Sequence, residues 1–268
     1  GVQTCALPIY FLIPDYHSSI ITPDGDIFMM GGQNPENPEI RYNNTWELNI
    51  SQKTLFPRAN MISSRDSHAM CYIDGFIYVI GGISDEEEKK TVTRKCEKYD
   101  VFQDKWTPIA ELSIPICNHC ATPFNGKYIY CFGGRNQQGK LNNTILRYTI
   151  ETDSWNCLKL RSLNKAKLRF SLTSQAACTQ INDEQIFVFG GYLQDRKVSN
   201  QSFLLEVQEK QEEDLLSQEE VERKEKWQIK NVNRRPLTFA APFWDKQVIC
   251  YNGQLYCLQN VISINNPR

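Results

Sequence analysis

The strongest constraint on the fold of this chain is a pair of adjacent glycines that recurs along its 268 residues. The pairs are Gly31-Gly32, Gly81-Gly82, Gly133-Gly134 and Gly190-Gly191, in steps of 50, 52 and 57 residues. A period of about 20 to 50 residues is typical of solenoids and propellers, in which each copy is one supersecondary unit. The chain is therefore predicted to be a repeat protein.

Each glycine pair is preceded by two predicted strands joined by a tight turn. The second strand is a short apolar run, at residues 27–30, 77–80, 129–132 and 186–189, and such β-branched and aromatic runs are typical of strands buried on both faces. The turns before these runs are Asp24-Gly25, Asp74-Gly75, Asn125-Gly126 and Asn182-Asp183. Asp-Gly and Asn-Gly permit the positive φ angles of a type I′ turn, so the two strands should form an antiparallel hairpin.

Two more strands are predicted after each glycine pair, marked by aromatic residues. Tyr99 and Trp106 stand seven residues apart, as do Tyr148 and Trp155. In the first copy the corresponding positions are Leu48 and Leu55, and in the fourth they are Leu205 and Trp227, which implies an insertion.

A fifth copy begins with Asn252-Gly253 and the run 255–258, and too few residues remain after it for its last two strands. Four antiparallel strands in a unit of about 50 residues are the signature of a propeller blade. The apolar run into Gly-Gly, followed by Tyr and Trp seven apart, resembles the kelch family over roughly residues 10–260. We therefore predict an all-β, kelch-type propeller of four full blades and part of a fifth. Since kelch propellers usually close with six or seven blades, the resemblance implies a fragment.

Two segments depart from the repeat. Residues 1–9 (GVQTCALPI) share no pattern with the rest of the chain and are interpreted as non-native, so the propeller domain is assigned to residues 10–268. The insertion at 206–226 holds nine acidic and four basic residues and no aromatic. It is interpreted as a solvated helix or loop, with a partner-docking helix as the alternative. The shorter charged run at 85–90 is expected to be a solvated loop.

The charge balance disfavours several functions. Thirty Lys and Arg residues face 31 Asp and Glu residues, whereas nucleic-acid binders usually carry a basic excess. No apolar stretch approaches the ~18 residues needed to cross a bilayer. We therefore expect neither a nucleic acid nor a membrane as partner.

The ten cysteines are expected to be reduced thiols, because several lie within alternating apolar runs where a free cysteine behaves as a small hydrophobe. A chain of this size also has no need of disulfides. These points predict a cytoplasmic protein.

The three histidines, His17, His68 and His119, are 51 residues apart and precede the first strand of successive copies. Three imidazoles near a propeller axis suggest a metal set. The alternative, which we favour, is that equivalent repeat positions carry a structural histidine. No phosphate-binding loop or nucleophile elbow is present, so we predict no cofactor, no metal and no catalytic residue.

Binding residues are expected on one face of the propeller. The alternation of strands sends the loops after the glycine pairs, at 33–44, 83–94, 135–143 and 192–199, to the same face as the links between blades. Loops above a rigid scaffold carry function, and Arg and Tyr often anchor interfaces. The candidate partner-binding residues are Arg41, Tyr42, Arg65, Arg135 and Tyr192.

The predicted function is therefore that of a protein-interaction scaffold or adaptor. The kelch resemblance implies this role, since members of the family serve as scaffolds, cytoskeletal binders and ubiquitin-ligase receptors. The alternative is an enzyme that acts on sugars, because some kelch propellers resemble copper-dependent sugar oxidases or sialic-acid mutarotases. Such an oxidase needs non-equivalent ligands, whereas the histidines here are repeat-equivalent.

Overall fold

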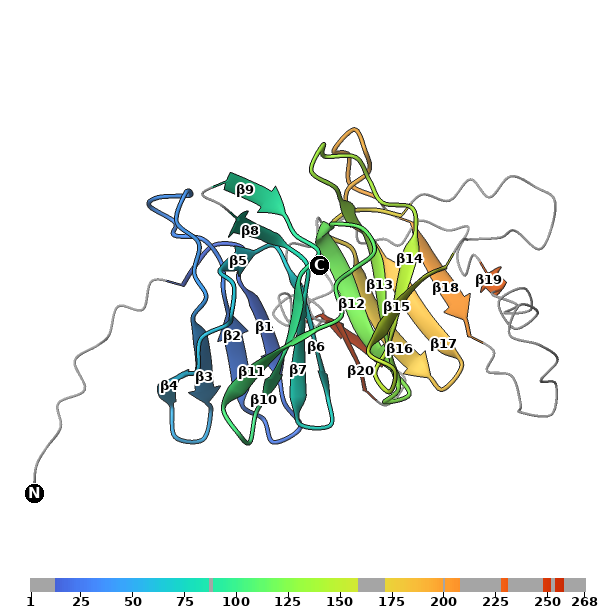
Figure 1. Cartoon of the computed structure of the whole chain (residues 1–268). Coiled ribbons are helices and arrows are strands. Elements are labelled where there is room, and N and C mark those ends of the chain that lie inside the picture. Colours follow the sequence, from blue (N-terminus) through green and yellow to red (C-terminus); the bar gives the residue numbers. More distant parts are fainter. Residues whose placement is uncertain are drawn as a thin grey trace, which may run out of the picture.

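The computed structural model describes residues 13–86, 89–158, 172–199 and 201–207, together with backbone strands at 228–230, 248–251 and 254–257. Figure 1 shows strands in every described part of the chain, gathered into four-stranded antiparallel sheets that stand side by side like the blades of a propeller. The predicted all-β propeller is thus confirmed.

The first two blades follow the predicted order of strands. Blade 1 contains β1 (Ser18–Ile21), β2 (Ile27–Met30), β3 (Thr45–Asn49) and β4 (Thr54–Arg58). Blade 2 contains β6 (Ala69–Ile73), β7 (Phe76–Ile80), β10 (Cys96–Asp100) and β11 (Lys105–Ile109). In each blade the strands pair antiparallel in sequence order from the innermost strand outward.

The remaining strands complete two more blades and begin another. Blade 3 contains β12 (Cys117–Phe124), β13 (Tyr128–Arg135), β14 (Ile145–Thr149) and β15 (Ser154–Leu158). Blade 4 contains β16 (Ala177–Asn182), β17 (Gln185–Phe189), β18 (Ser202–Glu206) and β19 (Gln228–Lys230). The hairpin of β20 (Val248–Tyr251) and β21 (Gln254–Cys257) is the predicted start of a fifth blade.

The first strand of every blade is innermost. Strand β6 contacts β1 and β12, and β16 contacts β12 and β20, so these strands surround a common axis. In Figure 1 the short hairpin turns lie at the bottom of the blades, and the loops that come after the glycine pairs project from the top. This arrangement confirms the two faces predicted from strand alternation.

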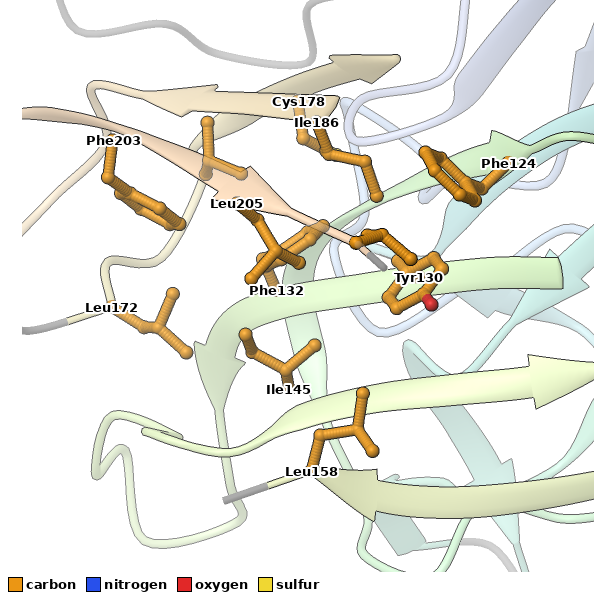
Figure 2. Close-up of a cluster of buried hydrophobic side chains, with 12 residues drawn as sticks. Phe124, Tyr130, Phe132, Ile145, Leu158, Leu172, Cys178, Ile186, Phe203 and Leu205 are labelled. Atoms are coloured by element: carbon orange, nitrogen blue, oxygen red, sulfur yellow. The ribbon is translucent and has the colours of Figure 1, made fainter. Parts of the chain in front are cut away.

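The apolar cores lie between neighbouring blades. Figure 2 shows the core between blades 3 and 4, where Phe132 and Ile145 of blade 3 meet Ile186 and Leu205 of blade 4. None of these four residues is more than 1% exposed. Burying a side chain of this size stabilises the fold by about 1.5 to 3 kcal/mol. Each blade is therefore stabilised mainly by apolar contacts with its neighbouring blades.

The glycine pairs join one blade to the link that enters the next. Both glycines of each pair have positive φ, for example +57° at Gly81 and +99° at Gly82, which glycine adopts at little cost. The Gly82 amide then donates to the carbonyl of Ile116 at 2.9 Å. The amides of Gly32 and Gly134 likewise donate to Arg65 and Thr173.

The Tyr–Trp spacing also has a structural cause. Tyr99 lies opposite Trp106 in the β10–β11 pair, and its hydroxyl donates to Asp104 Oδ1 at 2.6 Å. Asp104 also accepts the Ala59 amide at 2.7 Å, while the Trp106 indole donates to the Ala59 carbonyl at 2.8 Å. These hydrogen bonds join blade 2 to Ala59, the residue directly after the outer strand of blade 1.

The same set of hydrogen bonds recurs between blades 3 and 2. There Tyr148, Asp153 and Trp155 hold both polar groups of the Ala110 backbone. Blade 1 keeps the register without the aromatics, because Leu48 lies opposite Leu55.

Two expectations for the outer regions need correction. Residue Leu205 lies opposite Ile229 rather than Trp227, and Trp227 itself lies outside the described residues. The charged run at 85–90 is not a plain loop. Strands β8 (Ile83–Glu86) and β9 (Lys89–Val92) pair there and join β5 (Arg65–Asp66) in a three-stranded sheet. The register sets acidic residues opposite lysines, with Asp85 facing Lys90, which favours cross-strand pairing.

Several predictions concern residues that the structure does not describe. Residues 1–9 and the insertion beyond Val207 lie outside the described residues.

The seven cysteines whose side chains are described are free thiols. No helix within the described residues is long and apolar enough to cross a membrane.

Candidate functional site

The loop face is organised around a partial ring of backbone hydrogen bonds, which joins the first four blades near the axis. The Ser67 amide donates to the Tyr16 carbonyl at 3.0 Å, Asn118 to Ser67 at 2.9 Å, and Gln175 to Asn118 at 2.7 Å. Tyr16, Ser67 and Gln175 lie two residues before the innermost strands of their blades, and Asn118 is the second residue of β12. All four residues have φ between +54° and +55°. The repeat therefore fixes one backbone geometry in four blades and joins these blades near the axis.

A pocket of about 500 Å³ opens above this ring on the loop face. Its wall combines the ring with the loops that come after the glycine pairs. The lining residues that matter for recognition are Tyr16, Asp66, Lys90, Arg135, Tyr192 and Arg196. A second cavity of about 480 Å³ lies below the ring, in the channel between the innermost strands. Ser67, Asn118 and Gln175 line both.

Arg135 is the best-positioned cation of the upper pocket, which we call the mouth pocket. Its Nε donates to Ser174 Oγ at 3.0 Å, its Nη1 to the Gly139 carbonyl at 2.7 Å, and its Nη2 to the Leu193 carbonyl at 2.8 Å. All three acceptors are neutral, and two of them belong to blade 4. The guanidinium is thus held in place without a carboxylate.

The charges of the mouth pocket do not balance. Within the described residues, Arg135, Arg196 and Lys90 form no ion pair, whereas Asp66 is already paired with Arg41 at 2.7 Å. Burial, followed by the nearby guanidinium of Arg196, lowers the pKa of Arg135. Two guanidinium groups that repel each other at one site favour an anion between them.

Two of the five predicted partner-binding residues line this pocket. Arg135 and Tyr192 are both partly exposed there. Tyr42 is also partly exposed but lies outside the pocket lining, and its backbone bridges the Gly32 carbonyl and the Arg65 amide. Their contact with a partner stays a prediction.

Arg65 is not available to a partner, contrary to the prediction from the sequence. Only 1% of the residue is exposed, and its Nη2 donates to Glu97 Oε1 at 2.6 Å. Its Nη1 also donates to the carbonyls of Gly81 and Lys95, each at 2.8 Å. Because a buried charge must be paired and hydrogen-bonded, Arg65 is a structural residue that joins the blade 1–2 link to blade 2.

The expectation for Arg41 is wrong for the same reason. Its side chain is fully buried and binds two carboxylates, Asp66 at 2.7 Å and Asp85 at 2.6 Å. It fastens the loop of blade 1 to β5 and β8.

Arg196 and Lys90 are pocket residues that the sequence did not single out. Both lie in loops assigned to the binding face, and both are exposed. The preference for loop arginines at interfaces would by itself have included Arg196. Lys90 belongs to the charged run that was expected to be a solvated loop, and only its strand pairing in the structure directs attention to it.

His68 and His119 lie between blades, whereas His17 is partly exposed. The Cβ atoms of His68 and His119 pack against Gly82 and Gly134 of their own blades, and their rings reach Gly31 and Gly81 of the preceding blades. Burial lowers the pKa of His119 to about 3, and burial followed by Arg65 lowers the pKa of His68 well below its usual value. Among the described residues, no three His, Cys, Asp or Glu side chains are grouped to hold a metal ion.

We expect stability to fall as the pH drops below about 6.5. There the unfolded chain protonates His68 and His119 while the folded chain keeps them neutral, which costs roughly 1 kcal/mol per pH unit for each histidine. Urea unfolding at pH 7.5, 6.5, 5.5 and 5.0 measures this slope. A His68→Leu/His119→Leu variant should flatten it between pH 6.5 and 5, and an unchanged slope would contradict the assignment.

Comparison with known proteins finds similarity to β-propeller and kelch-repeat proteins. The model of the Attractin/LZTR1 beta-propeller matches residues 27–225. Kelch repeat and BTB domain-containing protein 2 of Homo sapiens is 26% identical over 196 residues, covering 65% of this chain and 27% of the relative. The same-named protein of Cowpox virus (strain GRI-90 / Grishak) is 27% identical over 179 residues, covering 59% of this chain and 30% of the relative.

Two further proteins are similar to this chain. Beta-scruin of Limulus polyphemus is 26% identical over 187 residues, covering 66% of this chain and 19% of the relative. The chain thus spans between 19% and 30% of the length of these three relatives. The solved structure of YjhT superposes with a TM-score of 0.67 at 16% identity, covering 93% of this chain and 72% of that one. At this identity the superposition establishes the fold alone.

Proposed function

Because this chain belongs to the Attractin/LZTR1 beta-propeller family, we propose that it is a protein-interaction module that docks an acidic segment of a partner in the mouth pocket. Kelch-repeat relatives support an interaction role in general. The observation that carries the specific proposal is the set of three cations that line the pocket, Arg135, Arg196 and Lys90. None of them forms an ion pair within the described residues, and the carboxylate beside them, Asp66, is already paired with Arg41.

The chemistry of Arg135 fits a carboxylate. Three of its five N–H groups bind neutral acceptors, so two remain for a ligand. A planar guanidinium can bind a carboxylate with two parallel hydrogen bonds. Arg196 adds a second charge beside it, and the partly exposed Tyr192 provides an amphipathic surface of the kind that interfaces favour.

The pocket is also preorganised by contacts between the loops of blades 3 and 4. Gln194 accepts the Leu141 amide at 2.8 Å and donates to the Gly139 carbonyl at 3.2 Å. Gly139 is the same residue that accepts from Arg135. A loop that is ordered before binding loses less entropy when the partner docks.

An adaptor role in a longer protein is part of this proposal. Two of the similar proteins carry a BTB domain by name, and this chain matches less than a third of either. In our proposal the propeller captures the partner through its loop face, and another part of the longer protein acts on the captured partner.

Selection of random displayed peptides on the purified chain tests the docking site. We expect the selected peptides to be rich in Asp and Glu. The Kd of one such peptide, measured by calorimetry, should weaken about tenfold or more in an Arg135→Ala/Arg196→Ala variant, because charge-assisted hydrogen bonds contribute about 1.5 to 3 kcal/mol. Binding should also weaken as salt increases.

Two single variants make this test specific. Arg196→Ala removes an exposed side chain that forms no hydrogen bond with another described residue, so we expect a loss of affinity without a loss of stability. Arg94→Ala is the matched control, since Arg94 is 52% exposed and pairs with Glu111 at 3.0 Å. Selected peptides without acidic residues, or equal losses in Arg196→Ala and Arg94→Ala, would refute the proposal.

A further inference from the structure

Two cysteines face each other across the boundary between blades 3 and 4. Cys120 lies on β12 and Cys178 on β16, the innermost strands of those blades, which contact each other. Cys178 belongs to the apolar cluster between the blades, and Cys120 packs against that cluster. In Figure 2, Cys178 stands above Ile186 at the edge of this cluster. The Cys120 thiol donates to the Phe132 carbonyl at 3.8 Å and is close enough to Cys178 to affect the pKa of that thiol.

The repeat does not require thiols at this place. Cys120 pairs with Phe132, directly before the glycine pair of its blade, and Ala69 of blade 2 holds the same position opposite Ile80. Cys178 corresponds in the same way to Ala121 of blade 3. The boundary between blades 2 and 3 is thus closed by two alanines where that between blades 3 and 4 has two cysteines.

Both cysteines border the channel between the innermost strands. Cys120 and Cys178 line the cavity of about 480 Å³ between the innermost strands. Cys120 is the more exposed of the two. Burial, followed by the neighbouring Cys120 thiol, raises the pKa of the Cys178 thiol. Cys120 is therefore expected to react first.

We propose that Cys120 and Cys178 are an oxidant-sensitive thiol pair that forms a disulfide across the blade 3–4 boundary. The oxidant is hydrogen peroxide. Cys120 sulfur attacks one peroxide oxygen, the O–O bond breaks, and the departing hydroxide leaves as water with the thiol proton. Cys178 sulfur then attacks the resulting sulfenic acid, the S–O bond breaks, and a second water leaves. Two thiols are oxidised by two electrons, and one peroxide is reduced to two waters.

The position of the pair gives the disulfide a structural effect. It closes the same blade boundary that Arg135 crosses to reach Ser174 and Leu193. A covalent link between β12 and β16 should hold these blades together and raise the melting temperature. The proposal does not depend on the proposed function, since it needs no partner.

Peptide mapping of the peroxide-treated chain tests the proposal. After treatment, remaining thiols are blocked, the chain is digested without reduction, and linked peptides are identified by mass spectrometry. We expect the Cys120 and Cys178 peptides to be linked, the link to be lost with dithiothreitol, and the melting temperature of the oxidised chain to be higher by roughly 5 °C.

Variants distinguish this pair from the other thiols. In Cys178→Ser, peroxide should leave a sulfenic acid on Cys120 that dimedone traps. Cys157→Ala removes an exposed cysteine and should leave the link intact. A link between Cys71 and Cys131 in place of the proposed one, or peroxide oxidation of Cys157 with both channel thiols unchanged, would overturn the proposal.

Discussion

Gly133→Ala is expected to destabilise the chain by about 4 kcal/mol or more, a loss that belongs to the exceptional range for single substitutions. Gly133 has φ of +68°, and a Cβ added to it would overlap the carbonyl oxygen of Thr173 in the link to blade 4. That atom is backbone and is fixed by the hydrogen bond from the Gly134 amide. The blades would have to separate to accept the methyl group. Urea unfolding followed by tryptophan fluorescence measures the change.

Gly139→Ala is the matched control for this prediction. Gly139 has nearly the same φ, +71°, but a Cβ there meets no atom within 4 Å. The Gly139→Ala variant should therefore lose only the free energy needed to hold an alanine in the left-handed backbone conformation, roughly 1 to 2 kcal/mol. If Gly133→Ala gives no soluble protein while Gly139→Ala does, the prediction holds in its strongest form. Equal losses of stability in the two variants would show that the contact with Thr173 is not what requires glycine.

Arg65→Met is expected to cost about 3 to 5 kcal/mol, because it removes one partner of a buried ion pair. Side-chain exposure is 1% at Arg65 and 2% at Glu97, so the Glu97 carboxylate would stay buried without a countercharge. The carbonyls of Gly81 and Lys95 would also lose the hydrogen bonds that they accept from Arg65. Denaturant unfolding at neutral pH measures the loss.

Two further variants separate charge from packing at this site. Arg65→Met/Glu97→Gln should recover a large part of the stability, since a glutamine oxygen can still accept the Ile62 amide, which Glu97 binds at 2.7 Å. Arg58→Met breaks a pair in which the arginine side chain is 37% exposed and should cost no more than about 1 kcal/mol. A loss at Arg65 as small as that at Arg58 would contradict the structural role assigned to the buried pair.

The difference between Arg65 and Arg135 shows what a single sequence cannot predict about the binding face. The sequence places both arginines on the loop face, Arg65 in the link between blades 1 and 2 and Arg135 directly after a glycine pair. Arg65 is buried because Glu97, 32 residues later in the chain, lies across the blade boundary. Arg135 lines a pocket because its acceptors come from the loops of blades 3 and 4. Burial depends on contacts between blades, and no single repeat contains that information.

The propeller fold was determined by local sequence alone. Tight turns, apolar runs, glycine pairs with positive φ and the Tyr–Trp spacing each specify a hairpin or a connection within about 50 residues, and their recurrence specifies a propeller. The tertiary structure decided which loop side chains face solvent, that the run at 85–90 pairs into a ribbon, and that Cys120 meets Cys178. Those outcomes involve residues from different blades, and such contacts exist only after neighbouring blades pack together.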